Sequence, residues 1–240
     1  MILKTTDFDY FLPESLIAQT PIEPRDHSKL MVLDRISGEI EHRHFLDLLD
    51  YLIEGDVMVF NDSRVIPARL YGKEDVHGHN IELLLLTQLQ KNVWRSLVKP
   101  GRRMREGAKF LIGLGVQSIQ GKVIGVENSG TRIIKLDGDE KIHEIGVVPL
   151  PPYIKERVDD PERYQTVYSN KEGSIAAPTA GLHFTKNLLC KIQNKGVKVV
   201  FVTLHVGWDS FRPIKTEDPK KHEMHSEFWE LSDESAETIN

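Results

Sequence analysis

The 240-residue sequence contains a single cysteine, Cys190, and this scarcity excludes two kinds of site. One cysteine cannot form an intramolecular disulfide, and it cannot supply a zinc cluster built on cysteine ligands. So low a cysteine content is typical of a protein from a reducing compartment. We therefore expect a cytoplasmic protein.

Long hydrophobic runs are also missing. The longest, IELLLL and VKVVFV, are far too short to cross a bilayer as a helix, and the N-terminus MILKTTDFDYF has acidic residues where a signal peptide would be apolar. We expect neither secretion nor membrane insertion. Since 40% of the residues are hydrophobic, the chain is expected to bury a sizeable core, in one large domain or two smaller ones.

The chain has no excess of positive charge, because its formal net charge is -5. This balance argues against a general nucleic-acid coat protein but leaves room for a local basic patch that binds a defined RNA. The run KPGRRMREGAK is such a patch, and its candidate phosphate contacts are Lys99, Arg102, Arg103, Arg105 and Lys109. A solvated hairpin loop is the alternative, since no aromatic residues interleave to stack on bases.

The most distinctive stretch is residues 174–185, SIAAPTAGLHFT, which we term the signature segment. It surrounds His183 with alanine and glycine, so that a ligand can approach the backbone closely. Thr185 is a predicted helix N-cap, which puts His183 near the positive end of a helix dipole. The alternative is a tight connection whose small residues permit close packing, with His183 bonded to backbone.

Polar residues also follow two predicted strands. Asp62 and Arg64 come directly after the apolar residues 57–60, and His205 ends the apolar run VKVVFVTL, with Arg212 shortly after it. Ligand sites favour such strand ends. For the first position the alternative is an Asx-type turn in which Arg64 pairs with Asp62.

Two more polar clusters carry open alternatives. Residues 25–28, RDHS, indicate either a polar ligand site or a solvated loop before a strand at residues 30–34. His222 and His225 are separated by two residues within a predicted alternating strand, which makes a metal site conceivable, but no third ligand is fixed by spacing.

The organisation of the chain changes between residues 72 and 146. Short β-type runs separated by glycines fill this span, whereas helical and strand patterns alternate on either side of it. We expect an α/β protein, with residues 1–71 and 147–240 forming a discontinuous mixed α/β main domain and residues 72–146 an inserted, small antiparallel β-barrel-like domain whose ends lie close together. Helices are expected in LPESLIAQ, in HFLDLLDYLIEG, after Thr185 and after Ser232.

Five stretches, in the same order, resemble the S-adenosylmethionine:tRNA ribosyltransferase-isomerases of queuosine synthesis. They are LPESLIAQTPIEPRDHSKLMVLD, NDSRVIPARL, PLPPYIKERVDDPERYQTVY, GSIAAPTAGLHFT, and LHVGWDSFRP followed by HEMHSEF. The resemblance implies that S-adenosylmethionine is a co-substrate, that no metal is needed, and that the partner is a tRNA with a modified deazaguanine at the wobble position. The ribosyl part would be transferred to its 7-aminomethyl group and isomerised to epoxyqueuosine, with release of adenine and methionine.

The resemblance also implies roles for residues. A base must remove a proton from the carbon next to the sulfonium, and His183 is the first candidate and His205 the second, because histidine titrates near neutrality. Arg64 or Arg212 is expected to hold the methionine carboxylate, and Phe184 to stack on adenine. The expected substrate-binding residues are Asp62, Arg64, Pro178, Thr179, Ala180, Gly181, Phe184, Thr185 and Arg212, and the expected tRNA contacts are Lys99, Arg102, Arg103 and Arg105.

Two departures from the family pattern stand out. Trp208, Asp209 and Ser210 occupy a turn where family members usually carry a small Gly-Thr pair, and family members continue past Asn240. A chain without that continuation is expected to bind poorly or be inactive. The alternatives are a non-catalytic RNA-binding or assembly module that uses the basic run, and a metal-dependent hydrolase that uses His222 and His225.

Overall fold

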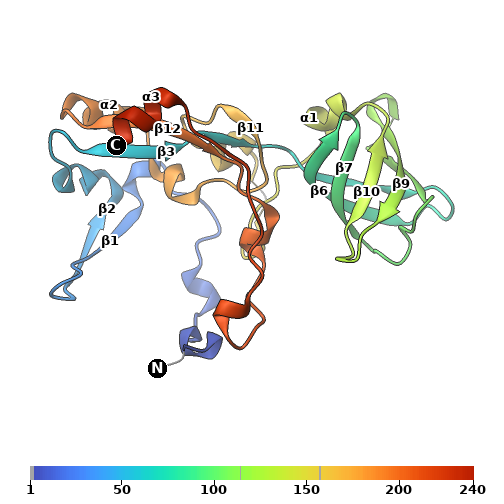
Figure 1. Cartoon of the computed structure of the whole chain (residues 1–240), viewed down its shortest axis with the longest axis horizontal. Coiled ribbons are helices and arrows are strands. Elements are labelled where there is room, and N and C mark those ends of the chain that lie inside the picture. The colour runs from blue at the N-terminus through green and yellow to red at the C-terminus, as the bar shows by residue number, and fades with distance from the viewer. Residues whose placement is uncertain (1–2, 114, 157) are drawn as a thin grey trace. The chain divides into compact units, whose positions relative to one another are not determined.

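The structure, a computed structural model, describes residues 3–113, 115–156 and 158–240, and the chain forms two compact units (Figure 1). Unit 1 comprises the residues up to Arg64 and from Leu150 on, and unit 2 is Val65–Pro149. The expected boundary at residue 72 falls inside strand β5 (Arg69–Glu74). This strand belongs to unit 2 because strands of unit 2 pair with it on both sides.

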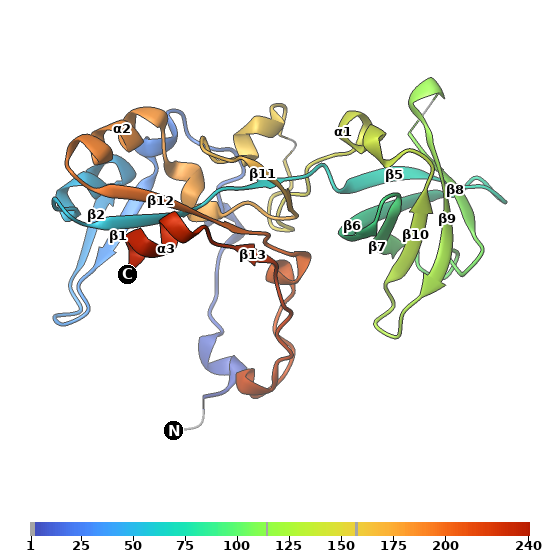
Figure 2. The same cartoon turned by 45° about the horizontal axis from the view of Figure 1, so that its top comes forward.

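Unit 2 is a closed barrel of six strands, which confirms the expected antiparallel barrel (Figure 2). All its neighbouring strands are antiparallel. Along the chain the strands are β5, β6 (Asn80–Gln90), β7 (Val93–Lys99), β8 (Lys109–Ile112), β9 (Ile119–Val126) and β10 (Arg132–Leu136). Around the barrel their order is β10-β7-β6-β5-β8-β9. Alternating side chains such as those of Ile112 and Ile134 fill the interior and are fully buried.

The two ends of unit 2 lie next to each other. Arg69 N donates to Val147 O (3.0 Å) and Val147 N donates to Arg69 O (2.8 Å). The short helix α1 (Ile142–Ile145) comes just before this pairing. The chain can therefore leave and re-enter the barrel at one place.

Unit 1 contains three small sheets. In the largest, β3 (Val57–Asn61) runs parallel to β12 (Lys198–Leu204), and β13 (Trp229–Glu230) pairs antiparallel with the other edge of β12. The other two are the hairpin of β1 (Lys29–Leu33) and β2 (Ile40–His44) and the pair of β4 (Ser63–Val65) with β11 (Lys171–Ser174). The parallel pair is the βαβ-like part of the unit, since helix α2 (Lys186–Asn194) leads into β12.

Two of the four expected helices are α-helices. Helix α2 begins at Thr185, whose hydroxyl accepts from Leu188 N (3.0 Å), and Gly196 follows it in the left-handed region (φ +84°). Helix α3 (Asp233–Ile239) begins at Ser232. Near the N-terminus the prediction was wrong, because only 3-10 turns form at Glu14–Leu16 and Phe45–Tyr51. Leu16 is 72% exposed, so no packing stabilises a longer helix there.

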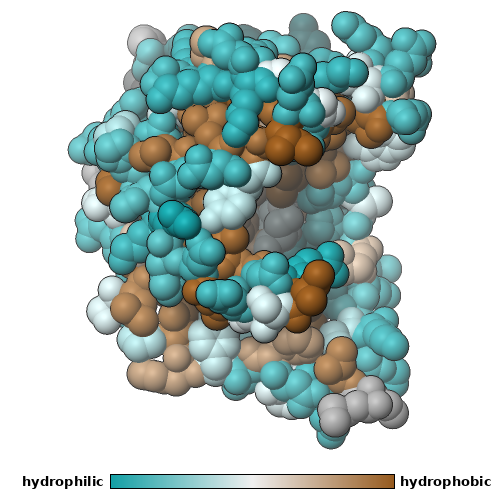
Figure 3. All heavy atoms as spheres, turned by 90° about the vertical axis from the view of Figure 1, so that its left-hand side faces the viewer, coloured by the Kyte–Doolittle hydropathy of each residue, from teal (hydrophilic) through white to brown (hydrophobic). Residues whose placement is uncertain are grey.

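Not all apolar surface in unit 1 is buried. On the face drawn in Figure 3, hydrophobic residues reach the surface between hydrophilic ones. In the β1-β2 hairpin Met31, Leu33 and Ile40 are exposed, whereas Leu30 packs against the core of unit 1. Within the described residues, no helix has the length and apolar character needed to cross a membrane.

Candidate functional site

The first half of the signature segment, residues 174–179, borders a cleft of about 450 Å³. Its wall includes Ala176, Ala177, Pro178 and Thr179 from this half, Val206, Ser210 and Phe211 from the stretch after β12, and Tyr153. We term it the apolar cleft, because alanine, proline, valine and aromatic side chains make up most of its lining.

Hydrogen bonds join these two stretches of chain behind the apolar cleft. Ile175 N and Ala176 N donate to Val206 O (2.9 and 3.2 Å), and Val206 N donates to the Ser174 hydroxyl (2.8 Å). Ala177 N donates weakly to the Tyr164 hydroxyl (3.4 Å), and burial raises the pKa of that hydroxyl to about 12. The cleft wall is thus held by backbone bonds and by a phenol that stays protonated at neutral pH.

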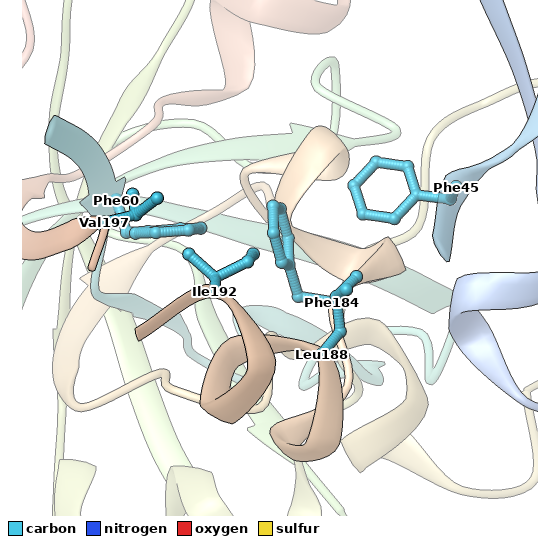
Figure 4. Packing of buried hydrophobic residues seen from close by; sticks show 6 residues of the cluster. All are labelled: Phe45, Phe60, Phe184, Leu188, Ile192 and Val197. Atoms are coloured by element: carbon cyan, nitrogen blue, oxygen red, sulfur yellow. The ribbon is translucent and has the colours of Figure 1, made fainter. Parts of the chain in front are cut away.

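The second half of the signature segment, residues 180–185, is mostly turned inward. A Cβ on Gly181 would lie 2.2 Å from the Tyr168 hydroxyl, so the glycine permits close packing and not ligand access. Phe184 lies between Phe45 and Phe60, with both ring centroids 4.9 Å away and both rings nearly perpendicular (Figure 4).

This packing corrects two expected contacts. Phe184 is 5% exposed and belongs to the core cluster with Leu188 and Ile192, so its ring is not available to stack on adenine. Gly181 is buried against Tyr168 as well, so its backbone is not an approach for substrate. Ala180 is exposed but does not belong to the lining of the apolar cleft.

His183 also belongs to the second half. Its Nδ1 lies 2.8 Å from the Ser28 hydroxyl, and its ring centroid lies 5.1 Å from that of Phe45. Burial, and to a smaller extent the positive charge of Arg163, lowers the pKa of His183. The ring is therefore oriented by a side-chain hydroxyl, and it is not part of the lining of the apolar cleft.

Residues 25–28 support the signature segment from behind, a role that the sequence pattern did not indicate. Arg25 donates to the carbonyl oxygens of Gln165 (2.6 Å) and Glu162 (3.0 Å). Asp26 accepts from the Thr185 hydroxyl (2.7 Å). The Thr185 hydroxyl also accepts from Leu188 N as the cap of α2, so its donor hydrogen and one of its lone pairs are used within the protein. Arg25, Asp26 and Ser28 thus bond within the protein, whereas His27 is exposed as expected for a solvated loop.

A second cleft, of about 530 Å³, lies beside β12 and α3. Asp62, Lys171, Thr203 and Glu230 contribute to its wall, and we term it the polar cleft. The buried carboxylate of Asp62 accepts from the Thr203 hydroxyl (2.6 Å), and Lys171 pairs with Glu230 (2.8 Å). The polar cleft thus offers fixed charges of both signs.

His205 lies one residue beyond the end of β12, and the charges of Asp62, Lys171 and Glu230 in the polar cleft act on its pKa. Burial lowers the pKa of His205, against the opposing attraction of the Asp62 carboxylate. Its ring stacks on Phe228 (5.6 Å between centroids), and Gly173 leaves room for it, since a Cβ there would lie 2.8 Å from Nε2. The Nδ1 atom is buried and has no hydrogen-bond partner among the described residues, and His205 belongs to the lining of neither cleft.

The two arginines expected to hold a carboxylate are paired within the protein. Arg64 donates to the Ser169 hydroxyl (3.0 Å) and forms an ion pair with Glu162, so the expected Arg64–Asp62 pair is wrong. The Asx-type turn itself forms, because Asn61 Oδ1 accepts from Ser63 N (3.0 Å). Arg212 pairs with Asp209 (2.8 Å) and is exposed. Each of the two guanidinium groups therefore already has an acidic partner within the protein.

In the stretch with His222 and His225, one of the two histidines contacts a carboxylate that also bonds to the backbone of the turn after β12. His225 Nε2 lies 2.8 Å from Glu227 Oε1, which also accepts from Gly207 N (2.7 Å) at the start of the turn Trp208–Phe211. The expected alternating strand is limited to Trp229–Glu230. In the described parts of the chain, no group of three or more His, Cys, Asp or Glu side chains is placed to hold a metal ion.

In unit 2 the basic run forms the connection between β7 and β8. The side chains of Lys99, Arg102, Arg103 and Arg105 are exposed, and none of them has an ion-pair partner among the described residues. Arg132 orders this loop by donating to the carbonyl oxygens of Met104 (2.8 Å) and Gly101 (2.7 Å), and Met104 is fully buried. The loop is therefore an ordered, cationic surface.

Comparisons with known proteins agree on one family. A family model described as "Queuosine biosynthesis protein" matches residues 5–240. Proteins from Staphylococcus aureus strains JH9 and Newman, both named S-adenosylmethionine:tRNA ribosyltransferase-isomerase, are 51% identical over 242 aligned positions, which cover 99% of this chain and 70% of each relative.

One solved structure is also similar. It is the crystal structure of S-adenosylmethionine tRNA ribosyltransferase from Thermotoga maritima, with 35% sequence identity, a TM-score of 0.41, and coverage of 97% of this chain. The chain spans 64% of the length of that protein. On the family match and the 51% identity, the chain belongs to the queuosine biosynthesis protein family.

Proposed function

We propose that this protein transfers the ribosyl part of S-adenosylmethionine to 7-aminomethyl-7-deazaguanine in tRNA and isomerises it to epoxyqueuosine, with release of adenine and methionine. Membership of the family supports this reaction, since the relatives are named for it. The observation that carries it is the apolar cleft, where two stretches that resemble the family, the signature segment and the stretch after β12, form one wall. The tRNA with its modified wobble base and a cytoplasmic location belong to the same proposal.

The two clefts suit different parts of S-adenosylmethionine. The apolar cleft has aromatic side chains, Tyr153 and Phe211, that can face a flat purine ring. The polar cleft has the buried Asp62 carboxylate, which can attract the positive sulfonium. Pro178 and Thr179 are the residues of the signature segment that would contact the ring.

We assign the base to His205 in preference to His183. The sulfonium acidifies the neighbouring 5′ carbon of the ribose, so a neutral imidazole can remove its proton. The ring then opens as adenine leaves, the substrate amine attacks the opened carbon skeleton, and methionine leaves from the sulfonium carbon as the epoxide closes. Burial keeps the His205 ring neutral near pH 7, and the ring is close enough to Asp62 and Lys171 of the polar cleft for their charges to act on it. His183 is instead held between Ser28 and Phe45 and acts as a positioning residue for the signature segment.

The basic loop of unit 2 would contact tRNA phosphates. Lys99, Arg102, Arg103 and Arg105 are exposed and free of acidic partners among the described residues, so binding phosphate breaks no ion pair. Arg102→Ala combined with Arg103→Ala should weaken tRNA binding and flatten its salt dependence by up to about two ion equivalents. An unchanged salt slope would show that this loop is only a solvated turn.

Adenine release from labelled S-adenosylmethionine, measured with tRNA that carries 7-aminomethyl-7-deazaguanine, tests the reaction and the base together. His205→Ala should slow release by about 10²-fold or more with tRNA affinity unchanged, whereas His183→Ala should act mainly through stability. The assignment of the base is overturned if His205→Ala retains full turnover and His183→Ala loses it.

The ordered basic loop also supports a second candidate function, a non-catalytic RNA-binding module. The same assay separates the two functions. Retention of tRNA without any release of adenine by the unmodified protein would favour the module and contradict the enzyme.

A further inference from the structure

Three lysines lie side by side on the outer surface of the barrel. Lys109 of β8 is directly opposite Lys122 of β9, and Lys122 is directly opposite Lys135 of β10. Figure 2 shows these three strands next to one another. All three side chains are exposed, whereas the next residues in each strand, Phe110, Val123 and Leu136, are buried. The lysines therefore form one row across three strands, which we term the lysine row.

Such a row is unfavourable for the barrel itself. Like charges directly opposite each other on antiparallel strands repel, and opposite-charge pairs would contribute favourably at the same positions. None of the three lysines forms an ion pair with a described residue. Two acidic residues lie near the row in sequence or register. Asp75 N donates to Lys109 O, and Asp137 comes two residues after Lys135. Neither carboxylate forms an ion pair with one of the three lysines among the described residues.

We propose that the lysine row is a second phosphate-binding surface, which extends the contact of the basic loop with the RNA backbone. This inference rests on the proposed function, because it takes tRNA as the partner. The negative phosphates of a bound RNA would neutralise the three lysine charges and so remove their mutual repulsion, which no acidic side chain among the described residues offsets by pairing.

The spacing and position of the row fit this partner. Neighbouring strands are about 4.8 Å apart, so the row extends roughly 10 Å across two gaps, and flexible lysine side chains can adjust to successive phosphates. The row is also continuous with the basic loop. Gly107 N donates to Val123 O (2.8 Å) and Val123 N donates to Ala108 O (2.9 Å), so the end of that loop is bonded to the strand that carries Lys122.

The test is the salt dependence of tRNA binding by the whole protein. Replacing Lys109, Lys122 and Lys135 with Gln should make the slope of log K against log salt shallower by about 2 ion equivalents. The matched control changes Lys186, Lys191 and Lys215 to Gln, which removes the same charge from exposed lysines of unit 1 that have no ion pair with a described residue. The control should leave the slope nearly unchanged.

A second variant separates binding from folding. Lys122→Glu puts a negative charge between Lys109 and Lys135, so it should keep or raise the melting temperature while it weakens tRNA binding. Equal slopes for the triple variant, the control and the unmodified protein would overturn the inference. So would binding of anionic lipid vesicles that the triple variant loses while its tRNA binding is unchanged.

The outcomes also distinguish this inference from the proposed function. If the Arg102 and Arg103 variant loses tRNA affinity and the lysine variants do not, the lysine row is a solvated face and the proposed function stands. If the unmodified protein neither binds tRNA nor releases adenine, the proposed function fails first, and this inference fails with it.

Discussion

Residues 174–179 and residues 180–185 both contain small side chains, yet they contact different surroundings. Ala176, Ala177 and Thr179 border the apolar cleft, while Gly181 and Phe184 face the interior of unit 1. The small residues of the first half line a cleft, and the glycine of the second half leaves space for Tyr168. A run of alanine and glycine therefore does not by itself indicate a ligand site, because protein side chains can fill the same space.

Phe184→Ala should give the largest effect in the second half. It removes a ring that contacts both Phe45 and Phe60 from a buried position, and such truncations cost about 3–5 kcal/mol. Chemical denaturation should show this loss. A variant with nearly full stability would contradict the placement of Phe184 in the core, and stacking of Phe184 on adenine would again be a candidate role.

Gly181→Ala should have a smaller effect of the same kind. The added Cβ would meet the Tyr168 hydroxyl at 2.2 Å, so one of the two must shift, at a cost of about 1–3 kcal/mol. Gly181→Ala combined with Tyr168→Phe should recover part of the loss, because the phenylalanine lacks that hydroxyl. If the double variant recovers nothing, Tyr168 is not what Gly181 accommodates.

The pH dependence of stability should reveal His183 as part of the packed half. Because burial lowers its folded pKa below the ordinary 6.5, the unfolded chain takes up the proton first, and stability is lost as pH falls below about 6.5 towards the folded value. His183→Asn should therefore flatten the loss of stability between pH 7.5 and 5.5, measured by denaturation at each pH. Thr179→Ala, in the cleft-lining half, should leave this dependence unchanged.

Local sequence patterns predicted the elements whose formation depends on residues close together in the sequence. The cap at Thr185, the helix after it and the stop at Gly196 follow from residue types within one short stretch. The barrel follows from period-two patterns and turns, as its strand order now confirms. The predicted boundary at residue 72 divided its first strand, because nothing local distinguishes the start of β5 from the preceding strands of unit 1.

The parts that depend on distant segments were not predictable in the same way. No local pattern joins Ser28 to His183, Asp26 to Thr185 or Arg64 to Glu162. Phe184 follows His183 in the sequence, but its partners Phe45 and Phe60 come from other elements. For this reason the sequence singles out the segment, while its cleft-lining and packed residues could be separated only in the structure.

The affinity for S-adenosylmethionine of two neighbouring variants tests this division most directly. Thr179 and Ala180 are both exposed, but only Thr179 belongs to the lining of the apolar cleft, so Thr179→Phe and Ala180→Phe add similar bulk on either side of the division. Calorimetric titration should show affinity reduced by about 10-fold or more, or roughly 1.4 kcal/mol, for Thr179→Phe and nearly unchanged for Ala180→Phe. Equal affinities, or a larger loss for Ala180→Phe, would contradict the assignment of the apolar cleft as the substrate site.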